Sequence, residues 1–448
     1  MKLFQSSLKA FVAKFVLPPF FLIAIISPAS ALSVGSYNVV HEIMDWGPAT
    51  TKVIVDIGVL LGACPIEPDA FSVYVRRVDR RAEVSLLASG YREVRKAYIS
   101  DAHGNRVDVG GFVTLELACG PEDELGSPMN YLGTYAWISC DYTVKQTMDI
   151  VSNNVTVSEF MATTLGETFI PQIQGFSLNG YMRYVDETYG VVTLSYADYK
   201  PPGACEGSDF PLIVWLHGSE EGGSDPLLPI TAYKACAFAS PSAQAFFDGE
   251  AYVLAPQTET YWMDDGTQDL FEEKKGIHSK YLNALMGLIE TYIEKNPGVD
   301  QNRIYIGGAS NGGFMTMAMI LAFPDFFAAA FPVSEAAPDA LISEDALLSI
   351  VDLPIWFVHS ASDAVVSAPL FSLGTYDRLV KLGARNVWLS YPQRVVDTSG
   401  KYNSPDGSPY EYPGHWSWVY LHNNELNTVI DGKQVSFLEW LAAQRRGE

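Results

Sequence analysis

Cysteine, histidine and basic side chains are scarce in this chain. It has 5 cysteines and 7 histidines among 448 residues, and 29 Lys and Arg against 52 Asp and Glu, a formal net charge of −23. That charge repels phosphate, which excludes nucleic acid and anionic membrane surfaces as main partners. Only 18% of residues are charged and 48% are hydrophobic, so a folded protein is expected rather than a disordered one. The length suits about two domains.

The sequence also lacks an apolar run long enough to span a membrane. The longest candidate, residues 15–26, is about 12 residues and contains two prolines, whereas a spanning helix needs about 20. Three lysines precede this run, and the small residues Ala29-Ser30-Ala31 follow it. The competing interpretation is a membrane anchor. The pattern instead predicts a signal peptide over residues 1–31, cleaved after Ala31, and a secreted or periplasmic protein.

None of the five cysteines has zinc-site spacing, and no C-x-x-C pair is present. Export permits disulfides, and the odd number leaves at least one thiol without a partner in its own chain. Cys119 with Cys140 and Cys205 with Cys236 are plausible bridges, but spacing does not fix the connectivity. The chain also lacks a phosphate-binding loop and a nicotinamide fingerprint. We therefore expect no metal and no cofactor.

Two segments with different patterns follow the predicted signal peptide. Residues 32–160 contain short β-branched runs separated by glycine-rich turns, as in 53–57, 71–75 and 113–117. This spacing predicts an immunoglobulin-like β-sandwich domain, although the Cys…Trp…Cys spacing of antibody domains is absent. Residues 161–448 instead alternate continuous apolar strands, such as 212–216, with amphipathic helices, such as 280–295. That alternation predicts an α/β domain with a mostly parallel sheet.

The strongest chemical signal is the G-x-S-x-G sequence of residues 308–312. It lies between a predicted strand at 303–306 and a predicted apolar helix at 314–323. A strand, a tight turn and a helix are the context of a nucleophile elbow, in which Ser310 stands exposed above the sheet. The competing interpretation is a serine that only caps the helix.

A serine nucleophile needs a base and an orienting carboxylate, which follow it in the order acid and then histidine in this fold. Asp363 comes just after the predicted strand 354–358 and is the predicted acid. Asp352 precedes that strand and would emerge at the wrong end of the sheet, and Glu335 is the reserve candidate. The predicted base is His415, in a glycine-containing loop between aromatic residues. His422 is the weaker alternative because it falls in the helix that follows.

The oxyanion requires two fixed N–H donors. We predict one from Asn311, the residue after the nucleophile, and one from Ser219, in the loop that follows the strand 212–216. His217 precedes the nucleophile in the chain and is predicted to brace this loop. His359, four residues before Asp363, is predicted to shape the loop that carries the acid.

The segments WLHGSEEGG, YVLAPQTETYWMDDG, RIYIGGASNGGFMTMAMILAFPDFFAAAFPVSEA, PIWFVHSASDAVV and YEYPGHWSWVYLHNNE resemble bacterial secreted α/β-hydrolases. These are esterases and prolyl-oligopeptidase-like serine hydrolases with an N-terminal immunoglobulin-like domain, related to polyhydroxybutyrate depolymerase-type and feruloyl-type esterases. The resemblance covers roughly residues 170–445. It implies that Ser310, Asp363 and His415 form a catalytic triad and that the loop after Gly218 binds the oxyanion. Glu220 departs from the small residue often found there and disfavours anionic substrates.

The same resemblance places Trp262 in a region that lines the site, and Trp416 is predicted to wall a substrate pocket. A core position is the alternative for both tryptophans. The polar loop 396–407 is interpreted as solvated, with calcium binding as a weaker alternative because its spacing fits no EF-hand.

The predicted function is hydrolysis of small or polymeric carboxylic esters through an acyl-enzyme. A prolyl-oligopeptidase type of peptidase is the first alternative, and a non-catalytic polymer-binding protein is the second. The substrate's acyl and alcohol groups and the oligomeric state are not predicted.

Overall fold

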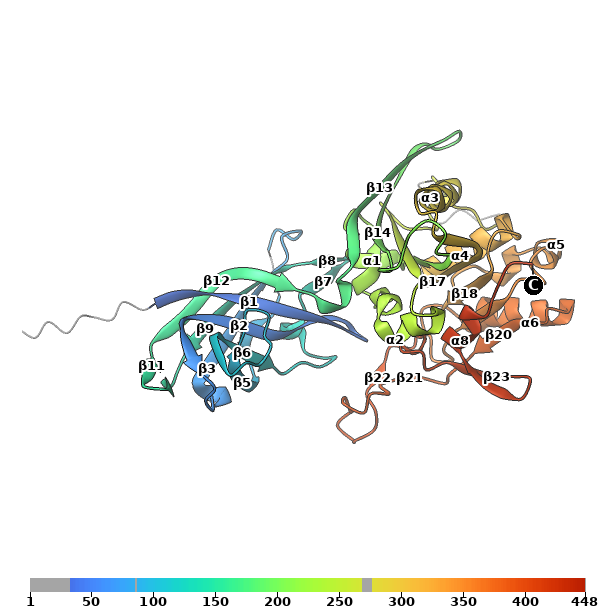
Figure 1. Ribbon diagram of the computed structural model, residues 1–448. Coiled ribbons are helices and arrows are strands. Elements are labelled where there is room, and N and C mark those ends of the chain that lie inside the picture. The colour runs from blue at the N-terminus through green and yellow to red at the C-terminus, as the bar shows by residue number, and fades with distance from the viewer. Residues whose placement is uncertain (1–32, 85–86, 268–275, 448) are drawn as a thin grey trace, which may run out of the picture.

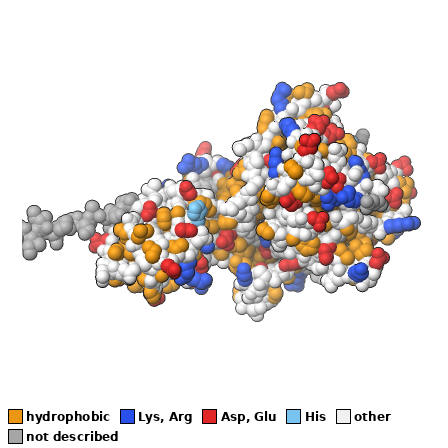
Figure 2. Space-filling model, in the orientation of Figure 1, with side chains coloured by type: hydrophobic (Ala, Val, Ile, Leu, Met, Phe, Trp, Pro, Cys, Tyr) orange, Lys and Arg blue, Asp and Glu red, His pale blue; other side chains and the backbone are white. Residues whose placement is uncertain are grey.

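The computed structural model of the protein describes residues 33–84, 87–267 and 276–447. The predicted signal peptide lies outside these residues. The described chain forms two bodies, an N-terminal β domain and a C-terminal α/β domain (Figure 1). No helix in the described ranges is both long and apolar enough to cross a membrane. Acidic and basic side chains are interspersed on the face of the α/β domain seen in Figure 2.

Eight strands of the β domain form one continuous sheet in the order β4-β3-β9-β12-β1-β2-β6-β5. β1 and β12 pair in parallel, and the other neighbours are antiparallel. The strands are β1 (Ser33–Met44), β2 (Gly47–Gly62), β3 (Phe71–Val78), β4 (Ser89–Arg92), β5 (Val94–Ser100), β6 (Val109–Leu117), β9 (Ser139–Gln146) and β12 (Phe160–Phe169). Two small hairpins accompany them, β7 (Met129–Leu132) with β8 (Thr134–Trp137), and β10 (Ile150–Ser152) with β11 (Val155–Val157).

Alternating side chains of this sheet build the core of the β domain. In β3 the residues Phe71, Val73 and Val75 are buried, while the residues between them are partly exposed. They pack with Val53 and Leu115 from the other half of the sheet, so the sheet curls over a single core. β12 continues this sheet past residue 160, the predicted domain boundary, to Phe169 through its pairing with β1.

Neither of the two plausible disulfides is formed. All five cysteines, which lie in the described residues, are free thiols. Cys236 is buried in a hydrophobic cluster of the α/β domain, whereas Cys205 is exposed. Cys140 is 3.9 Å from the carbonyl oxygen of Ser127 and packs against the β-domain core. The plausible pairs therefore fail because their members pack in different surroundings.

The α/β domain is built on a mixed sheet in the order β13-β14-β16-β15-β17-β18-β19-β20. β14 pairs antiparallel with both β13 and β16, and the remaining neighbours are parallel. The strands are β13 (Phe176–Asp186), β14 (Gly190–Tyr199), β15 (Phe210–Leu216), β16 (Tyr252–Thr258), β17 (Val299–Ala309), β18 (Ala329–Val333), β19 (Ile355–Val358) and β20 (Val387–Ser390).

Helices cover both faces of this sheet (Figure 1). Successive residues of β15 belong to different cores, with Val214 on one face and Trp215 on the other, as the alternation of a strand requires. The first core contains residues of α3 (Leu282–Lys295), α4 (Asn311–Ala322), α5 (Glu344–Leu348) and α6 (Ser372–Leu382). The second contains residues of α1 (Leu228–Thr231), α2 (Pro241–Gln244), α7 (Trp418–His422) and α8 (Phe437–Ala442).

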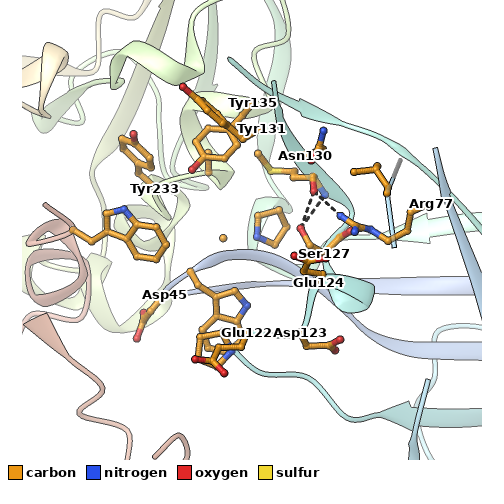
Figure 3. A pocket seen from close by; sticks show the side chains of 18 of the residues that line it. Asp45, Arg77, Glu122, Asp123, Glu124, Ser127, Asn130, Tyr131, Tyr135 and Tyr233 are labelled. Carbon is orange, nitrogen blue, oxygen red and sulfur yellow. Dashed lines mark hydrogen bonds between the residues drawn. The ribbon is translucent and has the colours of Figure 1, made fainter. Parts of the chain in front are cut away.

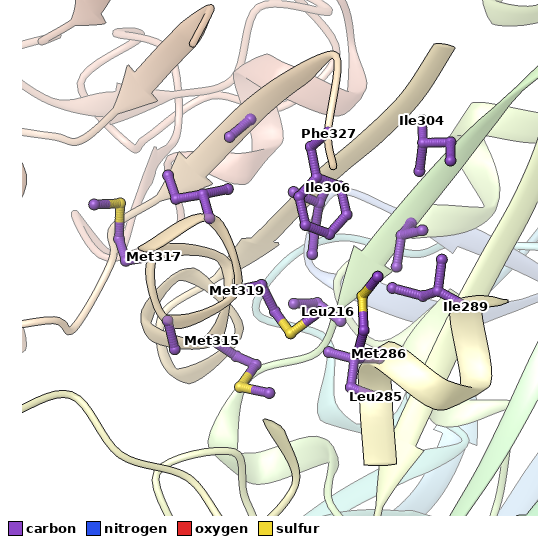
Figure 4. Close-up of a cluster of buried hydrophobic side chains, with 14 of the residues drawn as sticks. Leu216, Leu285, Met286, Ile289, Ile304, Ile306, Met315, Met317, Met319 and Phe327 are labelled. Carbon is purple, nitrogen blue, oxygen red and sulfur yellow. The ribbon is translucent and has the colours of Figure 1, made fainter. Parts of the chain in front are cut away.

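Helix α4 is apolar and buried on nearly all its sides, which is typical of a helix enclosed by a core. Figure 4 shows its methionines, including Met315 and Met319, beside Leu216 and Ile306 of the neighbouring strands. This packing fixes the helix against the ends of β15 and β17. The residues at its N-terminus are therefore held at the edge of the sheet where those strands end.

The β domain is joined to the α/β domain by two of its turns. At the tip of the β1–β2 hairpin, Asp45 pairs with the ammonium of Lys234 at 2.6 Å, and the ring of Trp46 meets that of Tyr402 at 4.7 Å. Met129 belongs to the second core of the α/β domain, and Tyr135 packs against it. The contact is thus apolar as well as charged, and the β7–β8 hairpin is part of it.

Candidate active site

Ser310 stands on a strained turn between β17 and α4. Its φ of 57° lies in a region that side chains rarely adopt. Its backbone N–H donates to the carbonyl oxygen of Val333 at 2.8 Å, which ties the turn to β18. A Cβ on Gly312 would lie 2.0 Å from the carbonyl oxygen of Leu216, so the turn accepts only glycine there. The Ser310 side chain makes no capping hydrogen bond, and so the interpretation of a capping serine is wrong.

Asp363 and His415 are joined directly. The carboxylate oxygen Oδ2 of Asp363 is 2.8 Å from Nδ1 of His415 and 3.1 Å from Nε2 of His359. The other oxygen accepts the N–H groups of Val365 and Val366 at 2.8 and 2.9 Å. Burial alone raises the pKa of Asp363, but hydrogen bonds from His359 and His415, with the charge of His415, outweigh it and hold that pKa well below its usual range. The carboxylate is therefore ionised at neutral pH.

The loop that carries His415 is fixed against the same strand end as Ser310. The hydroxyl of Ser334 donates to the carbonyl oxygen of His415 at 3.1 Å and lies 2.8 Å from the hydroxyl of Ser417. Ser334 follows Val333, which accepts the N–H of Ser310. The backbones of Ser310 and His415 are thus bonded to adjacent residues. Each of the two residues is 8% exposed.

No hydrogen bond joins the Ser310 hydroxyl to His415 among the described residues. Catalytic hydrogen bonds are often long before substrate binds. The relevant observations are therefore the attachment of both backbones to the end of β18 and the chain order of serine, acid and histidine. The direct contact between nucleophile and base stays a prediction.

A buried hydrogen-bond chain continues behind Asp363. Nδ1 of His359 is 2.8 Å from the hydroxyl of Ser372, and the same hydroxyl bonds the carboxyl of Glu335. His359 therefore links Asp363 to the interior and fixes the side of the carboxylate that faces away from solvent. Its position four residues before the acid is the only sequence signal for this role.

Glu335, the reserve acid, is fully buried at the inner end of this series of hydrogen bonds. Its Oε2 accepts the N–H of Ala337 at 2.5 Å, whereas Oε1 has no hydrogen-bond partner among the described residues. Burial raises the pKa of Glu335 from 4.5 to about 8, against the opposing hydrogen bonds from Ala337 and Ser372. A carboxyl that is protonated at neutral pH cannot stabilise an imidazolium as Asp363 can.

Glu335→Gln is expected to change how stability depends on pH. Because its pKa is higher in the folded chain, Glu335 contributes its full stability below about pH 4.5 and loses it as the pH rises through 8. Glutamine has no such loss, so the stability of the variant should gain on that of the wild type by about 1.4 kcal/mol per pH unit between pH 5 and 7.5. Urea unfolding at several pH values measures this difference. Glu294→Gln, at an exposed position of α3, should show the same dependence of stability on pH as the wild type. If the curve of stability against pH for Glu335→Gln also runs parallel to that of the wild type, the assignment is contradicted.

The loop after β15 is locked by buried side chains. Nδ1 of His217 is 2.6 Å from the carbonyl oxygen of Gly218, and its Nε2 is 3.1 Å from the N–H of Thr258. The N–H of Gly218 donates to the buried carboxyl of Glu221 at 2.8 Å. Glu220 accepts the Tyr233 hydroxyl at 2.6 Å. The N–H of Gly218 is therefore occupied, while that of Ser219 makes no hydrogen bond with the described residues.

Trp262 does not line an open site. Its side chain is fully buried in the first core, with its ring 5.1 Å from that of His217. Its backbone N–H donates to the side chain of Asn311 at 2.5 Å, which holds the residue after the nucleophile. The predicted substrate contact is thus wrong, because packing against His217 and the first core leaves no exposed surface on this ring. Trp416 is only partly buried and lines a cavity.

The ring of His422, the alternative base, packs against aromatic side chains of the second core. Its ring meets those of Trp215 and Phe238 at 4.6 and 5.0 Å, and neither nitrogen has a hydrogen-bond partner among the described residues.

In the polar loop 396–407, the carboxylate of Asp397 accepts a hydrogen bond from the hydroxyl of Ser399. No cluster of three or more metal-ligating side chains occurs within the described ranges.

Two family models match parts of the chain. Residues 36–159 match the esterase Ig-like N-terminal domain, and residues 278–337, which include Ser310, match the prolyl oligopeptidase family. These matches confirm the predicted resemblance to serine hydrolases with an immunoglobulin-like domain. No curated protein matches the chain by sequence.

Solved structures share the fold. A thermostable esterase has a TM-score of 0.72 at 24% identity, covering 92% of this chain and 100% of its own. A poly(3-hydroxybutyrate) depolymerase from Bordetella parapertussis has a TM-score of 0.36 at 15% identity, covering 47% and 82%. An S-formylglutathione hydrolase from Agrobacterium tumefaciens has a TM-score of 0.38 at 14% identity, covering 60% and 97%. The first likeness shows a fold shared along nearly the whole chain, and with the two family matches it supports an α/β-hydrolase domain behind an immunoglobulin-like domain. The other two likenesses are too distant to add to it.

Proposed function

We propose that the protein is an exported serine hydrolase that cleaves carboxylic esters with Ser310, His415 and Asp363. The observation that carries this proposal is the bond between Asp363 and Nδ1 of His415, at 2.8 Å, together with the strained turn that carries Ser310. A carboxylate on Nδ1 leaves Nε2 unprotonated and free to act as a base. Export is supported by the N-terminal sequence pattern alone.

The reaction follows from these positions. Ser310 attacks the ester carbonyl as His415 accepts its proton, and the N–H groups of Asn311 and Ser219 stabilise the oxyanion. His415 then protonates the departing alcohol, leaving Ser310 acylated. Water, deprotonated by His415, attacks the acyl-enzyme and releases the acid. Ser219 is favoured over Gly218 as a donor because Glu221 already occupies the N–H of Gly218.

The match to the prolyl oligopeptidase family keeps a peptidase as the second candidate. Such peptidases usually restrict access to their site with a propeller, whereas here an immunoglobulin-like domain precedes the hydrolase domain. We therefore rank esters first.

The purified full chain should hydrolyse p-nitrophenyl acetate and leave the p-nitroanilide of a proline-containing dipeptide intact. The two chromogenic leaving groups allow both reactions to be followed in the same way. Faster cleavage of the anilide would favour the peptidase, and no turnover of either substrate would contradict the proposal.

A further inference from the structure

We infer that the cavity between the two domains binds the alcohol part of the ester, and that it selects bulky aromatic alcohols that are neutral or cationic. This inference rests on the proposed function and adds its substrate class. The cavity has a volume of about 520 Å³, within the range of small-molecule sites. Both domains line it, so the β domain contributes directly to recognition (Figure 3).

Residues that line the cavity contact His415 and the loop after β15. Trp418 lines it and meets the ring of His415 edge-on, with centroids 5.9 Å apart. Tyr233 also lines it, stacks on Trp418 at 4.1 Å and bonds Glu220 of the oxyanion loop. Two tryptophans that line the cavity, Trp416 and Trp418, lie one and three residues after the base in sequence. Because His415 protonates the departing alcohol, the alcohol leaves on the side of the base, and Trp418 connects that side to the cavity.

The wall supplied by the β domain is rigid before any substrate arrives. Arg77, which is 5% exposed, donates to the carbonyl oxygens of Ser127 and Met129 at 3.0 and 3.2 Å. Arg81 donates to the carbonyl oxygens of Asn130 and Thr134 at 3.0 and 2.8 Å. These bonds fix the β7–β8 hairpin from both sides. A preorganised wall loses little entropy on binding, as a built subsite requires.

The lining determines the class of alcohol. Tyr131 and Tyr135 lie on one side of the cavity, and Glu122 and Asp123 lie on the opposite side (Figure 3). Asp123 and Asp45 pair with Arg92 and Lys234, and the guanidinium of Arg77 is directed to backbone carbonyl oxygens. Glu122 and Glu124, both exposed, form no ion pair with the described residues. Aromatic faces with unneutralised carboxylates attract aromatic and cationic groups and repel anions.

Tyr135→Ala tests the subsite with two acetates that share an acyl group. For 2-naphthyl acetate, kcat/KM should fall about tenfold, because the variant loses an aromatic wall. For ethyl acetate, which does not fill the cavity, it should stay within about twofold. Tyr181→Ala, on the exposed face of β13, is the matched control and should change neither value. Equal losses for both acetates would overturn the inference.

Charge selectivity supplies an independent measurement. At low salt the wild type should prefer 4-(trimethylammonio)phenyl acetate over 4-sulfophenyl acetate by about tenfold, and the double change Glu122→Gln with Glu124→Gln should reduce that preference to about threefold. A preference for the sulfonate, or one that the double variant leaves unchanged, would contradict the assignment.

Binding without turnover separates this inference from the proposed function. In the Ser310→Ala chain, 2-naphthol should quench tryptophan fluorescence at saturation, and adding Tyr135→Ala should weaken its binding about tenfold. If the wild type hydrolyses esters but 2-naphthol binds both chains equally, the subsite is wrong and the catalytic assignment stands. If the wild type hydrolyses no ester, the proposed function is wrong, and the assignment of the cavity to an alcohol group is wrong with it.

Discussion

Ser310→Ala is expected to lower kcat for p-nitrophenyl acetate by at least about 10⁴-fold. The hydroxyl is the nucleophile, and loss of a triad nucleophile leaves only the rate enhancement from binding and oxyanion stabilisation. The fold should survive, because this side chain makes no capping bond and the change should cost within about 1 kcal/mol. Turnover and thermal unfolding of the same preparations measure the two effects.

Ser349→Ala is the matched control for that experiment. Ser349 is exposed at the end of α5, where its hydroxyl bonds only the carbonyl oxygen of Ala346. Activity of this variant should equal that of the wild type. Retention of more than a tenth of the wild-type rate by Ser310→Ala would remove the serine from the mechanism.

Asp363→Asn should lower kcat by about 10³- to 10⁴-fold. One oxygen of Asp363 accepts two backbone N–H groups, so an asparagine would keep its oxygen there. Its NH₂ group would then face both His415 and His359, which need an acceptor at this place. His415 would turn to its other tautomer, with a hydrogen on Nε2, and would no longer accept the serine proton.

The opposite end of the same strand supplies the control. Asp352 is exposed just before β19, and Asp352→Asn should leave kcat unchanged. The pH profile adds a second criterion: because the pKa of Asp363 is held well below its usual range, loss of activity between pH 8 and 5 cannot come from protonation of this carboxyl. An inactive Glu335→Gln chain beside an active Asp363→Asn chain would transfer the acid role to Glu335.

The predictable parts of the fold are the buried segments, because burial requires apolar residues that can be recognised in the sequence. The predicted strands 212–216 and 303–306 fall within β15 and β17, and the predicted helix 280–295 is α3, Leu282–Lys295, because these segments are apolar where they pack. β12 and β13 were missed because many of their side chains are exposed and the strands are fixed by pairing. Hydrogen bonds between backbones leave no clear pattern in the sequence.

The site divides in the same way. Two features can be recognised in the sequence: a turn that tolerates only glycine, and the order of serine, acid and histidine. They are sufficient to predict the pair of Asp363 and His415 that the structure contains. Trp262 was misplaced because a tryptophan in a core and one in a pocket look alike in sequence. The contribution of Tyr135 had no signal at all, because it depends on how a hairpin of one domain packs against another.

Peptide mapping after reaction with a fluorophosphonate tests the central assignment most directly, since only a serine activated by its neighbours reacts quickly with this probe. The adduct should appear on the peptide that contains Ser310, and it should disappear when His415→Ala is treated in the same way. An adduct on a different serine, or labelling at an unchanged rate in the His415→Ala chain, would contradict the mechanism.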